Sequence, residues 1–444
     1  MSSRSAWQPS KQSINISYLG SVPPGWTIGR LKYSLSINPS HKECGAVPSG
    51  TKVPFFAMES IGDDGALKIE AEKSFEEASK AYTYFKNDDV IIAKVTPCFE
   101  NGKGALVKGL EGGYGFGTTE LVVLRASEKL NAKFLYYISL SNEVRHGGTA
   151  FMTGAGGLKR VPDDFYLNLV WPLPSISEQI KIVNFLDRET SKIDELIQKQ
   201  EKLIELIQEL QQAKILMCVT RGIKPVAKLK KSTNIWLDEI PSSWGEGNLK
   251  VLSKIYSGGT PDKSKQEYWT NGTIPWLNSG SVNDFYIFEP SEYITVEALS
   301  KSSAKWIKSG SVLVALAGQG KTKGMAAQLM FDSTCNQSMC AIVPSEKLNS
   351  NYLLWWLSAN YQNIRNLAGG DLRDGLNLEM IGSIKCPLPS INEQIEIAKY
   401  LDSVKEKNLH LIERCKKSIE LLTEHRSSLI SAAVTGKIDV REVA

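Results

Sequence analysis

The sequence predicts an α+β fold in which two homologous mixed α/β regions are joined by two long helices. The helices are expected to pair as an antiparallel coiled coil with pseudo-twofold symmetry. Three observations predict this fold: a stretch of the chain occurs twice, each copy has a long helical pattern, and each copy follows a region of short strand-like runs. An internal repeat determines the whole architecture of a chain.

The repeat relates residues 172–220 to residues 387–435 without a gap. Both copies begin with PLPSI followed by EQI. Upstream, LGSVPPGW (19–26) matches LDEIPSSW (237–244), and SEKLN occurs at 127–131 and again at 345–349. Two copies indicate a duplication and not a solenoid. Within the repeat, Leu186-Asp187 recurs as Leu401-Asp402, and Val219-Thr220 recurs as Val434-Thr435.

Each copy of the repeat predicts one long helix. Residues 176–217 contain no Gly or Pro, and Ser177 is the expected N-cap. Gly222 and Gly436 are the expected C-terminal stops. About 40 residues at 1.5 Å each make a rod of roughly 60 Å.

Apolar residues recur at three- and four-residue steps on both helices, which is typical of a coiled-coil stripe. Equal helix lengths favour an intramolecular antiparallel pair. Two alternatives stay open: each helix packs on its own globular region, or the chain dimerises through its helices. The stripe residues are Ile193, Leu196, Ile197, Leu203, Ile204 and Ile207 in the first helix, and Leu411, Ile412, Ile419, Leu422 and Ile430 in the second.

Both globular regions have the pattern of mixed α/β structure. Short β-branched runs at 90–93, 121–124 and 312–315 are separated by Gly- and Asn-rich loops. An aromatic helix is expected in each region, at 134–141 and 352–359, with a role in core packing. The predicted domains are 1–171 (first globular region), 172–223 (first helical spacer), 224–386 (linker and second globular region) and 387–444 (second helical spacer and tail).

Composition narrows the function only slightly. A net charge of +4 permits nucleic-acid binding without arguing for it, and the basic run 224–231 is expected to be a solvated tether. The seven cysteines and four histidines lack the spacing of a zinc site or a disulfide framework. Without a signal-like segment or an apolar run of roughly 18 residues, a cytoplasmic protein is expected.

The segment ALAGQGKT (315–322) satisfies a relaxed phosphate-loop pattern. A true phosphate loop is followed by a helix whose amides face the phosphates, and later by a strand that ends in an aspartate. Residues 325–331 are too short for a convincing helix. Nucleotide binding by Lys321 is therefore kept only as an alternative, beside a coiled-coil scaffold that binds only protein.

Other catalytic patterns are weaker. The acidic pairs Asp63-Asp64 and Asp163-Asp164 and the segment 261–263 are better explained as surface turns. A base-modifying methyltransferase would need a glycine-rich cofactor loop and an Asn-Pro-Pro-aromatic motif, which the sequence lacks. We therefore predict no catalytic residue, no metal ligand and no cofactor in this chain, which is not itself an enzyme.

Two dissimilar globular regions, each followed by a near-identical PLPSI.EQI helix that ends in Thr-Gly or Thr-Arg-Gly, resemble the specificity subunit of a type I restriction-modification system. The resemblance covers the whole chain. It implies that the globular regions are target recognition domains, each reading one half of a split double-stranded DNA site. It also implies that the helices act as a spacer that docks two methyltransferase subunits, and through them motor-nuclease subunits. S-adenosylmethionine, ATP and Mg would then belong to those partners.

Base readout needs Arg, Lys, Asn and Gln side chains on loops that can enter a groove, with further groups on phosphates. Three pairs of matched loops are the candidates: those after the strands at 90 and 312, those before the long helices, and those at 114–119 and 336–338. Trp276 is expected in the core. The candidate DNA-binding residues are Lys94, Thr96, Phe99, Asn101, Lys103, Tyr114, Thr118, Thr119, Lys159, Arg160, Asn278, Gln319, Lys321, Thr322, Lys323, Asn336, Gln337, Ser338 and Arg373.

Two homologous readers held at the ends of a rod would recognise half-sites about one helical turn, roughly 34 Å, apart. Because the two regions differ in sequence, the site should be asymmetric as well as bipartite. A non-specific gap of roughly 6 to 8 base pairs is expected from the same spacing rule.

Overall fold

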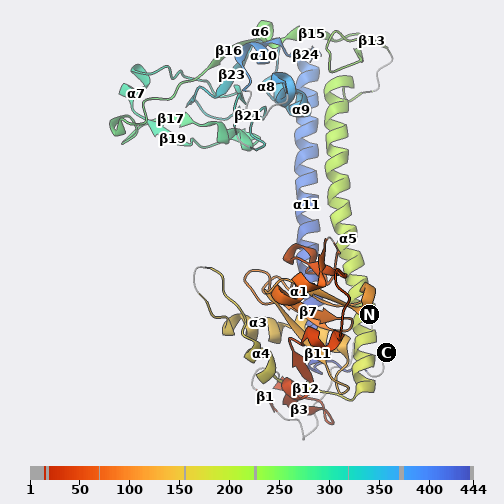
Figure 1. Ribbon diagram of the computed structural model, residues 1–444. Coiled ribbons are helices and arrows are strands. Elements are labelled where there is room, and N and C mark those ends of the chain that lie inside the picture. The colour runs from red at the N-terminus through yellow and green to blue at the C-terminus, as the bar shows by residue number, and fades with distance from the viewer. Residues whose placement is uncertain are drawn as a thin grey trace. The chain divides into compact units, whose positions relative to one another are not determined.

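The protein is described by a computed structural model, which covers residues 15–16, 20–69, 71–154, 157–224, 228–318, 320–369 and 375–440 (Figure 1). The chain divides into two compact units, residues 1–201 with 416–444 and residues 202–415. Each unit contains one globular region and a segment of each long helix. Among the described residues, no helix is both long enough and apolar enough to cross a membrane.

The first unit is built on two four-stranded sheets. One is antiparallel throughout, with the order β4 (Leu35–Ile37), β11 (Leu121–Ala126), β8 (Val90–Ala93) and β9 (Gly104–Leu106). The other has the order β6 (Ala71–Ser74), β5 (Lys52–Phe56), β10 (Tyr114–Gly117) and β7 (Thr83–Lys86), with β5 and β10 parallel. Two strand pairs complete it, β3 (Thr27–Arg30) with β12 (Val170–Leu173) and β1 (Asn15–Ile16) with β2 (Gly20–Ser21). Its short helices are α1 (Phe75–Ala81), α2 (Ala132–Leu140), α3 (Asn142–Phe151) and α4 (Asp163–Asn168).

The second unit has a five-stranded and a three-stranded sheet. The first of these has the order β16 (Ser253–Ser257), β23 (Met339–Pro344), β20 (Val312–Ala315), β21 (Ala326–Leu329) and β18 (Tyr286–Ile287). The second has the order β19 (Glu292–Ile294), β17 (Ile274–Leu277) and β22 (Thr334–Cys335). The strand pairs are β15 (Gly245–Asn248) with β24 (Lys385–Leu388) and β13 (Leu229–Lys231) with β14 (Glu239–Pro241). The short helices are α6 (Leu249–Leu252), α7 (Val296–Ser300), α8 (Ser350–Ala359), α9 (Tyr361–Arg365) and α10 (Leu378–Ser383).

Four strands of each unit follow one plan, since the order β4-β11-β8-β9 corresponds to β16-β23-β20-β21. The register agrees as well: Leu124 lies opposite Val90, and Ile342 lies opposite Val312. The predicted strands at 90–93, 121–124 and 312–315 are confirmed. The aromatic helix α2 contributes five buried residues to its core and α8 contributes six, so their predicted packing role is confirmed.

The two long helices are α5 (Ile176–Arg221) and α11 (Ile391–Val434) (Figure 1). The prediction that Ser177 is the N-cap was wrong, because the Ser175 hydroxyl accepts from the Glu178 amide at 3.3 Å and the helix has already begun at Ile176. Ser390 caps α11 in the same way. Gly222 stops α5 as predicted, with a positive φ of 83° and an amide that donates to the Cys218 carbonyl.

Residues of the EQI motif join each globular region to its long helix. Gln179 is fully buried; it donates to the carbonyls of Lys129 and Pro174 and accepts from the Asn131 amide. Gln394 makes the same three bonds, with Lys347, Pro389 and Asn349.

The glutamates of the two EQI motifs accept from the indoles of the upstream tryptophans, Glu178 from Trp26 and Glu393 from Trp244. The repeated sequence therefore encodes the same joint twice. We use this name for the contacts of Glu178 and Gln179 in the first half of the chain and of Glu393 and Gln394 in the second.

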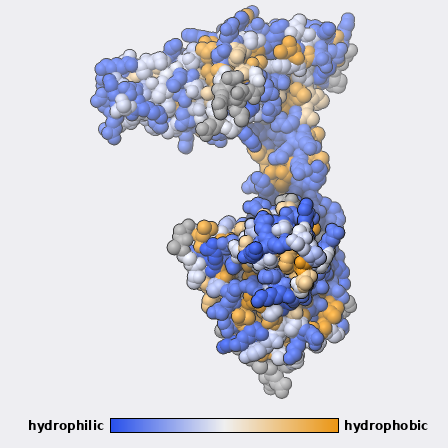
Figure 2. Space-filling model, in the orientation of Figure 1, coloured by the Kyte–Doolittle hydropathy of each residue, from blue (hydrophilic) through white to orange (hydrophobic). Residues whose placement is uncertain are grey.

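Every third or fourth residue of α5 is buried or half-buried from Ile193 onward, and α11 shows the same pattern. Of the predicted stripe, Ile193 and Ile430 are buried, and Ile197, Ile204, Ile207, Ile412, Ile419 and Leu422 are half-buried. Leu196, Leu203 and Leu411 instead lie outside this pattern of buried positions and are 46%, 44% and 43% exposed. Figure 2 shows hydrophobic patches among hydrophilic side chains along the long helices.

Two further expectations need correction. The basic linker is not wholly a tether, because residues 229–231 form β13 and Lys230 donates to the Trp244 carbonyl. Asp163 and Asp164 occupy the first turn of α4 and not a surface turn. Residues 326–329 form the strand β21, in agreement with the expectation that this segment is not a helix.

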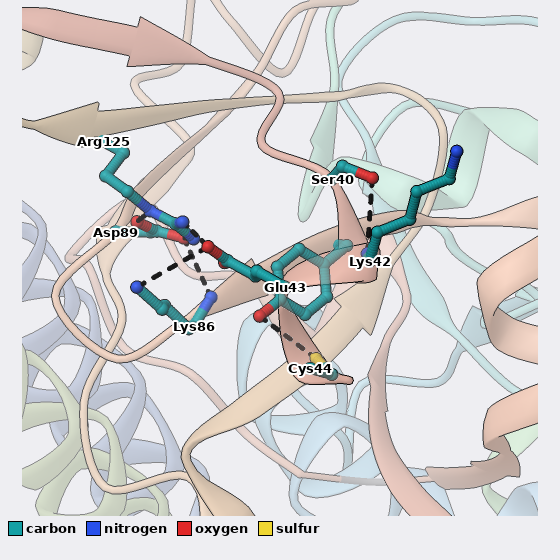
Figure 3. A network of polar contacts seen from close by, with 8 residues as sticks. Ser40, Lys42, Glu43, Cys44, Lys86, Asp89 and Arg125 are labelled. Carbon is teal, nitrogen blue, oxygen red and sulfur yellow. Dashed lines mark hydrogen bonds and ion pairs between the residues drawn. The ribbon is translucent and has the colours of Figure 1, made fainter. Parts of the chain in front are cut away.

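A polar network in the first unit lies at the start of β8 (Figure 3). Asp89, 1% exposed, receives two hydrogen bonds from Arg125 of β11, at 2.6 and 2.7 Å. Arg125 also donates to Glu43 at 2.6 Å. Burial alone would lower the pKa of Arg125, but these carboxylates raise it above its ordinary value. The network thus lies at one end of β8, and Lys94 follows the other end of this strand.

Candidate nucleic-acid interface

In the first half, the loop after β8 closes on itself through backbone hydrogen bonds. The Phe99 amide donates to the Val95 carbonyl at 2.9 Å, and the Lys103 amide donates to the Cys98 carbonyl at 3.0 Å. Asn101 is left exposed at the tip, whereas Phe99 is fully buried. Phe99 therefore supports the loop from inside and does not present its ring to solvent.

Two backbone hydrogen bonds made by Lys94 bring the three predicted loops of this half together. Its amide donates to the Glu120 carbonyl, and its carbonyl accepts from the Val161 amide, both at 2.9 Å. Thr96 strengthens the junction, because its hydroxyl donates to the Gly157 carbonyl at 2.8 Å and accepts from the Lys159 amide at 3.1 Å. The segments around residues 94–103, 118–120 and 157–161 thus form one surface.

The second half repeats this junction with different residues. Leu316 follows β20 as Lys94 follows β8; its amide donates to the Ser338 carbonyl and its carbonyl accepts from the Leu376 amide, both at 2.8 Å. The start of the loop after β20, the segment 336–338 and Leu376 therefore meet in the same way. Side chains differ while the backbone connections agree.

An arginine that the sequence analysis missed holds each loop after the central strand. Arg145 of α3 donates to the carbonyls of Phe99 and Gly102 at 2.8 and 3.3 Å. Arg365 of α9 donates to the carbonyls of Gly320 and Lys323 at 2.7 and 3.3 Å. The available signal was an arginine placed shortly before a Gly-Gly pair in both halves, at 145–148 and 365–370.

The charged candidates of the first half differ in their engagement. Arg160 makes a two-pronged contact with Glu120, at 2.8 and 2.5 Å, which raises the pKa of Arg160 and lowers that of Glu120. The Lys103 ammonium donates to the Met58 carbonyl at 3.1 Å. Lys159 is exposed, and its side chain makes no hydrogen bond or ion pair with another described residue.

The candidates of the second half are also unequal. Lys321 is exposed, whereas Lys323 is 3% exposed and is held inside. The Thr322 hydroxyl donates to Asn283 at 3.3 Å. Gln337 is exposed and accepts from Thr260 at 2.5 Å, and the Asn336 side chain accepts from the Ser338 amide at 3.1 Å.

Some candidates lie elsewhere or cannot be placed. Tyr114 begins β10, the strand that ends just before Thr118 and the exposed Thr119, and it packs against Phe75 and Tyr84. Asn278 accepts from the Gly280 amide at 2.8 Å next to Leu277, whose carbonyl accepts from Asn336. Trp276 is 1% exposed, as predicted. Gln319 and Arg373 lie outside the described residues.

A cleft of about 980 Å³ lies beside the Asn101 loop within the first unit. Acidic side chains outnumber basic ones on its walls, which include Asp63, Asp64, Glu100, Asp194 and Glu201. A phosphate backbone would be repelled there. The exposed lysine at 159 therefore marks a better approach for DNA than this cleft.

The geometry does not favour the nucleotide-binding alternative. The segment that contains Lys321 continues into the strand β21 and not into a helix, so no row of helical amides faces a phosphate. In the described part of the chain, no three or more His, Cys, Asp or Glu side chains gather to hold a metal ion. All seven cysteines are free.

Known proteins resemble this chain in sequence. A family model described as a type I restriction modification DNA specificity domain matches residues 241–421. The specificity subunit of the Escherichia coli type I restriction enzyme EcoAI is 29% identical over 294 residues, which are 66% of this chain and 46% of that subunit. The EcoEI specificity subunit, also from Escherichia coli, is 36% identical over 192 residues, 43% of this chain and 32% of that subunit. The chain thus aligns with less than half the length of either relative.

Solved structures agree with the fold. A chain from a study of complex assembly and conformational transition of the type I R-M system superposes with a TM-score of 0.74 and 20% identity, covering 94% of this chain and 99% of that one. The HsdS subunit from Thermoanaerobacter tengcongensis gives a TM-score of 0.56 at 20% identity, covering 94% and 98%. The named relatives are specificity subunits, in agreement with the predicted non-catalytic role. In sequence, the chain is similar to type I restriction-modification specificity subunits.

Proposed function

We propose that this chain selects the DNA sequence on which a type I restriction-modification complex acts. Its two globular regions, within the proposed domains 1–171 and 224–386, each read one half of an asymmetric, bipartite site. The observation that carries this proposal is the pair of loop junctions centred on Lys94 and Leu316. Identical backbone connections that present different side chains are what two readers with different target sequences require.

The contacts to DNA are assigned to the exposed candidates of each junction. Asn101 and Gln337 have amides that suit a base edge, whereas Lys159 and Lys321 suit phosphates or guanine. Phe99 and Lys323 are buried and keep only a supporting role in this proposal. Arg160 reads DNA only if it exchanges its contact with Glu120 for one with the nucleic acid.

The long helices, in the proposed domains 172–223 and 387–444, act as an antiparallel coiled-coil spacer with pseudo-twofold symmetry. Two contacts support this pairing: Arg426 donates to Asp194 at 2.8 Å, and Asn408 donates to Gln211 at 3.0 Å. The residue number rises along α5 while that of its partner falls along α11. This spacer would leave a gap of roughly 6 to 8 base pairs between the half-sites.

The long helices carry exposed leucines, and such apolar surface suits the docking of two methyltransferase subunits. Motor-nuclease subunits would join through those partners. S-adenosylmethionine, ATP and Mg are assigned to the partners, and this chain to recognition alone. The leucines of these helices that are 43–61% exposed are Leu196, Leu203, Leu206, Leu210 and Leu216 of α5 and Leu409, Leu411 and Leu421 of α11.

The test is sequencing of methylated adenines in a methylation-free host that expresses this chain with its cognate methyltransferase subunit. A host that expresses the methyltransferase subunit alone is the control. Methylation confined to one asymmetric motif with an unspecified gap, absent from the control, is the expected result. A continuous motif, or the same methylation without this chain despite assembly of both subunits, would reject the proposal.

A further inference from the structure

We infer that Arg145 and Arg365 are positioning residues that fix the loops through which the two halves discriminate bases. The inference rests on the proposed function and explains how each globular region discriminates between bases. In each half, one guanidinium sets the backbone of the loop after the central strand, without itself touching DNA. Base discrimination at each half-site then depends on its own arginine.

The two arginines hold their loops with the same geometry. Each donates from two nitrogens to two carbonyls that lie three residues apart, Phe99 and Gly102 in the first half and Gly320 and Lys323 in the second. The two helices that carry them, α3 and α9, both follow the aromatic core helix of their half. The two loops share little sequence, yet each is held by an arginine that donates to two of its backbone carbonyls.

The surroundings of the two arginines differ, but in both halves they hold the guanidinium against the loop. Arg145 is 9% exposed, and its guanidinium lies 4.9 Å from the centroid of the Phe99 ring. Gly148 leaves room for that ring, since a Cβ there would lie 2.4 Å from it. Arg365 is half-buried and also contacts Tyr361, whose hydroxyl donates to the Lys321 carbonyl at 2.6 Å.

Arginine suits this task for a chemical reason. Its planar guanidinium offers several donors at fixed angles, whereas lysine offers a compact charge on a flexible stem. Because the acceptors are backbone carbonyls, the hydrogen bonds set no condition on the exposed side chains of the loop. Asn101 and Lys321 can therefore differ between the halves and still be presented from a loop of fixed shape.

The experiment uses the full chain assembled with its cognate methyltransferase subunits, with Arg145→Lys and Arg365→Lys made separately. Each complex methylates a duplex library in which every position of both half-sites is varied, and the methylated products are sequenced. Arg30→Lys, at an exposed arginine of β3 whose side chain contacts Asn168, is the matched control. Co-purification and thermal unfolding report on assembly and folding.

Each variant should reduce discrimination against wrong bases by about tenfold or more at one half-site and leave the other half-site unchanged. The two variants should affect opposite half-sites, so each serves as a control for the other. A uniform fall in methylation at all positions, with base preference unchanged, would indicate a merely structural role and overturn the inference. So would unchanged discrimination in the half-buried Arg365→Lys variant, which is expected to fold. Absence of a bipartite motif with the unmodified chain would instead reject the proposed function.

Discussion

The joints and the loops of the two halves differ in what the duplication has kept. At the joints, identical residues make identical contacts, as Gln179 and Gln394 do with the carbonyls and amides around them. At the loops, the backbone bonds of Lys94 and Leu316 agree although the side chains do not. The joints thus share their side-chain contacts, whereas the loop junctions share their backbone hydrogen bonds. In the proposed function, the freedom of the loop side chains is what allows two half-sites of different sequence.

The largest effect is expected at a feature that the halves do not share, the buried pair of Asp89 and Arg125. The registers place Ser311 and Val343 at the equivalent positions of the second half. Arg125→Met would leave the Asp89 carboxylate buried without an opposite charge, with only the Lys86 amide donating to it, so the free energy of unfolding should fall by about 3–5 kcal/mol. Chemical denaturation of the purified chain measures this change.

The double variant Asp89→Ser/Arg125→Val gives the first half the solution of the second. It should cost clearly less than Arg125→Met alone, because no unpaired charge stays buried. If the double variant were as unstable as the single one, the network of Figure 3 would contribute more than the neutralisation of a buried charge.

The shared joint should be nearly as sensitive. Gln394→Leu removes three hydrogen bonds of a fully buried amide and leaves the groups of Lys347, Asn349 and Pro389 without that partner. A loss of about 3 kcal/mol is expected. Gln179→Leu should produce a similar loss through the first unit. Gln362→Leu, at an exposed position of α9, is the control, and similar stability of all three variants would contradict the account.

A smaller difference concerns Lys405 of α11, whose ammonium lies 3.4 Å from the Phe285 centroid. Burial lowers its pKa to about 8, while Asp402 opposes the shift. In the unfolded chain, Lys405 keeps its proton up to about pH 10.5. Between pH 8 and 10 the unfolded chain therefore binds more protons than the folded one, so the free energy of unfolding should rise with pH in this range. The equivalent residue of α5 is Thr190, which cannot contribute such a rise.

The variant Lys405→Met should flatten this rise by about 1 kcal/mol, a modest value because the side chain is half-exposed. Urea denaturation at pH 8 and pH 10 measures the difference. Lys407→Met, at an exposed position of the same helix, should leave the pH dependence unchanged. A variant of Lys405 that kept the full rise would show that another group titrates.

The smallest effect is expected at Lys159, proposed to contact a phosphate. Lys159→Ala should weaken binding of the assembled complex to all DNA sequences alike and lower the salt dependence of the logarithm of the binding constant by about one. Titration at several salt concentrations measures this slope. A change in base preference with an unaltered slope would assign Lys159 to base readout instead.

The repeat was sufficient to predict the long helices and their glycine stops, because helix length and termination depend on local sequence. The strands at 90–93 and 312–315 were also predictable from β-branched runs. The helix start was placed two residues late because Ser177 and Ser175 look alike in sequence, and only the hydrogen bond to the Glu178 amide separates them.

The candidate site was predictable as loops but not as side chains. The matched positions after β8 and β20 did meet the other predicted loops, since strand order determines which loops are neighbours. The burial of Phe99 and Lys323 depends on tertiary packing that no local pattern records. Arg145 and Arg365 were missed for the same reason: they act on backbone carbonyls distant in sequence.

The central claim, that each half reads its own half-site, is tested most directly by a chain that carries the second globular region in both positions. After co-purification with the methyltransferase subunits, sequencing of methylated adenines would give its motif. The account predicts a bipartite palindrome made of the second half-site and its inverted copy. A motif that retained the original first half-site, or one that lost its division into two parts, would contradict it.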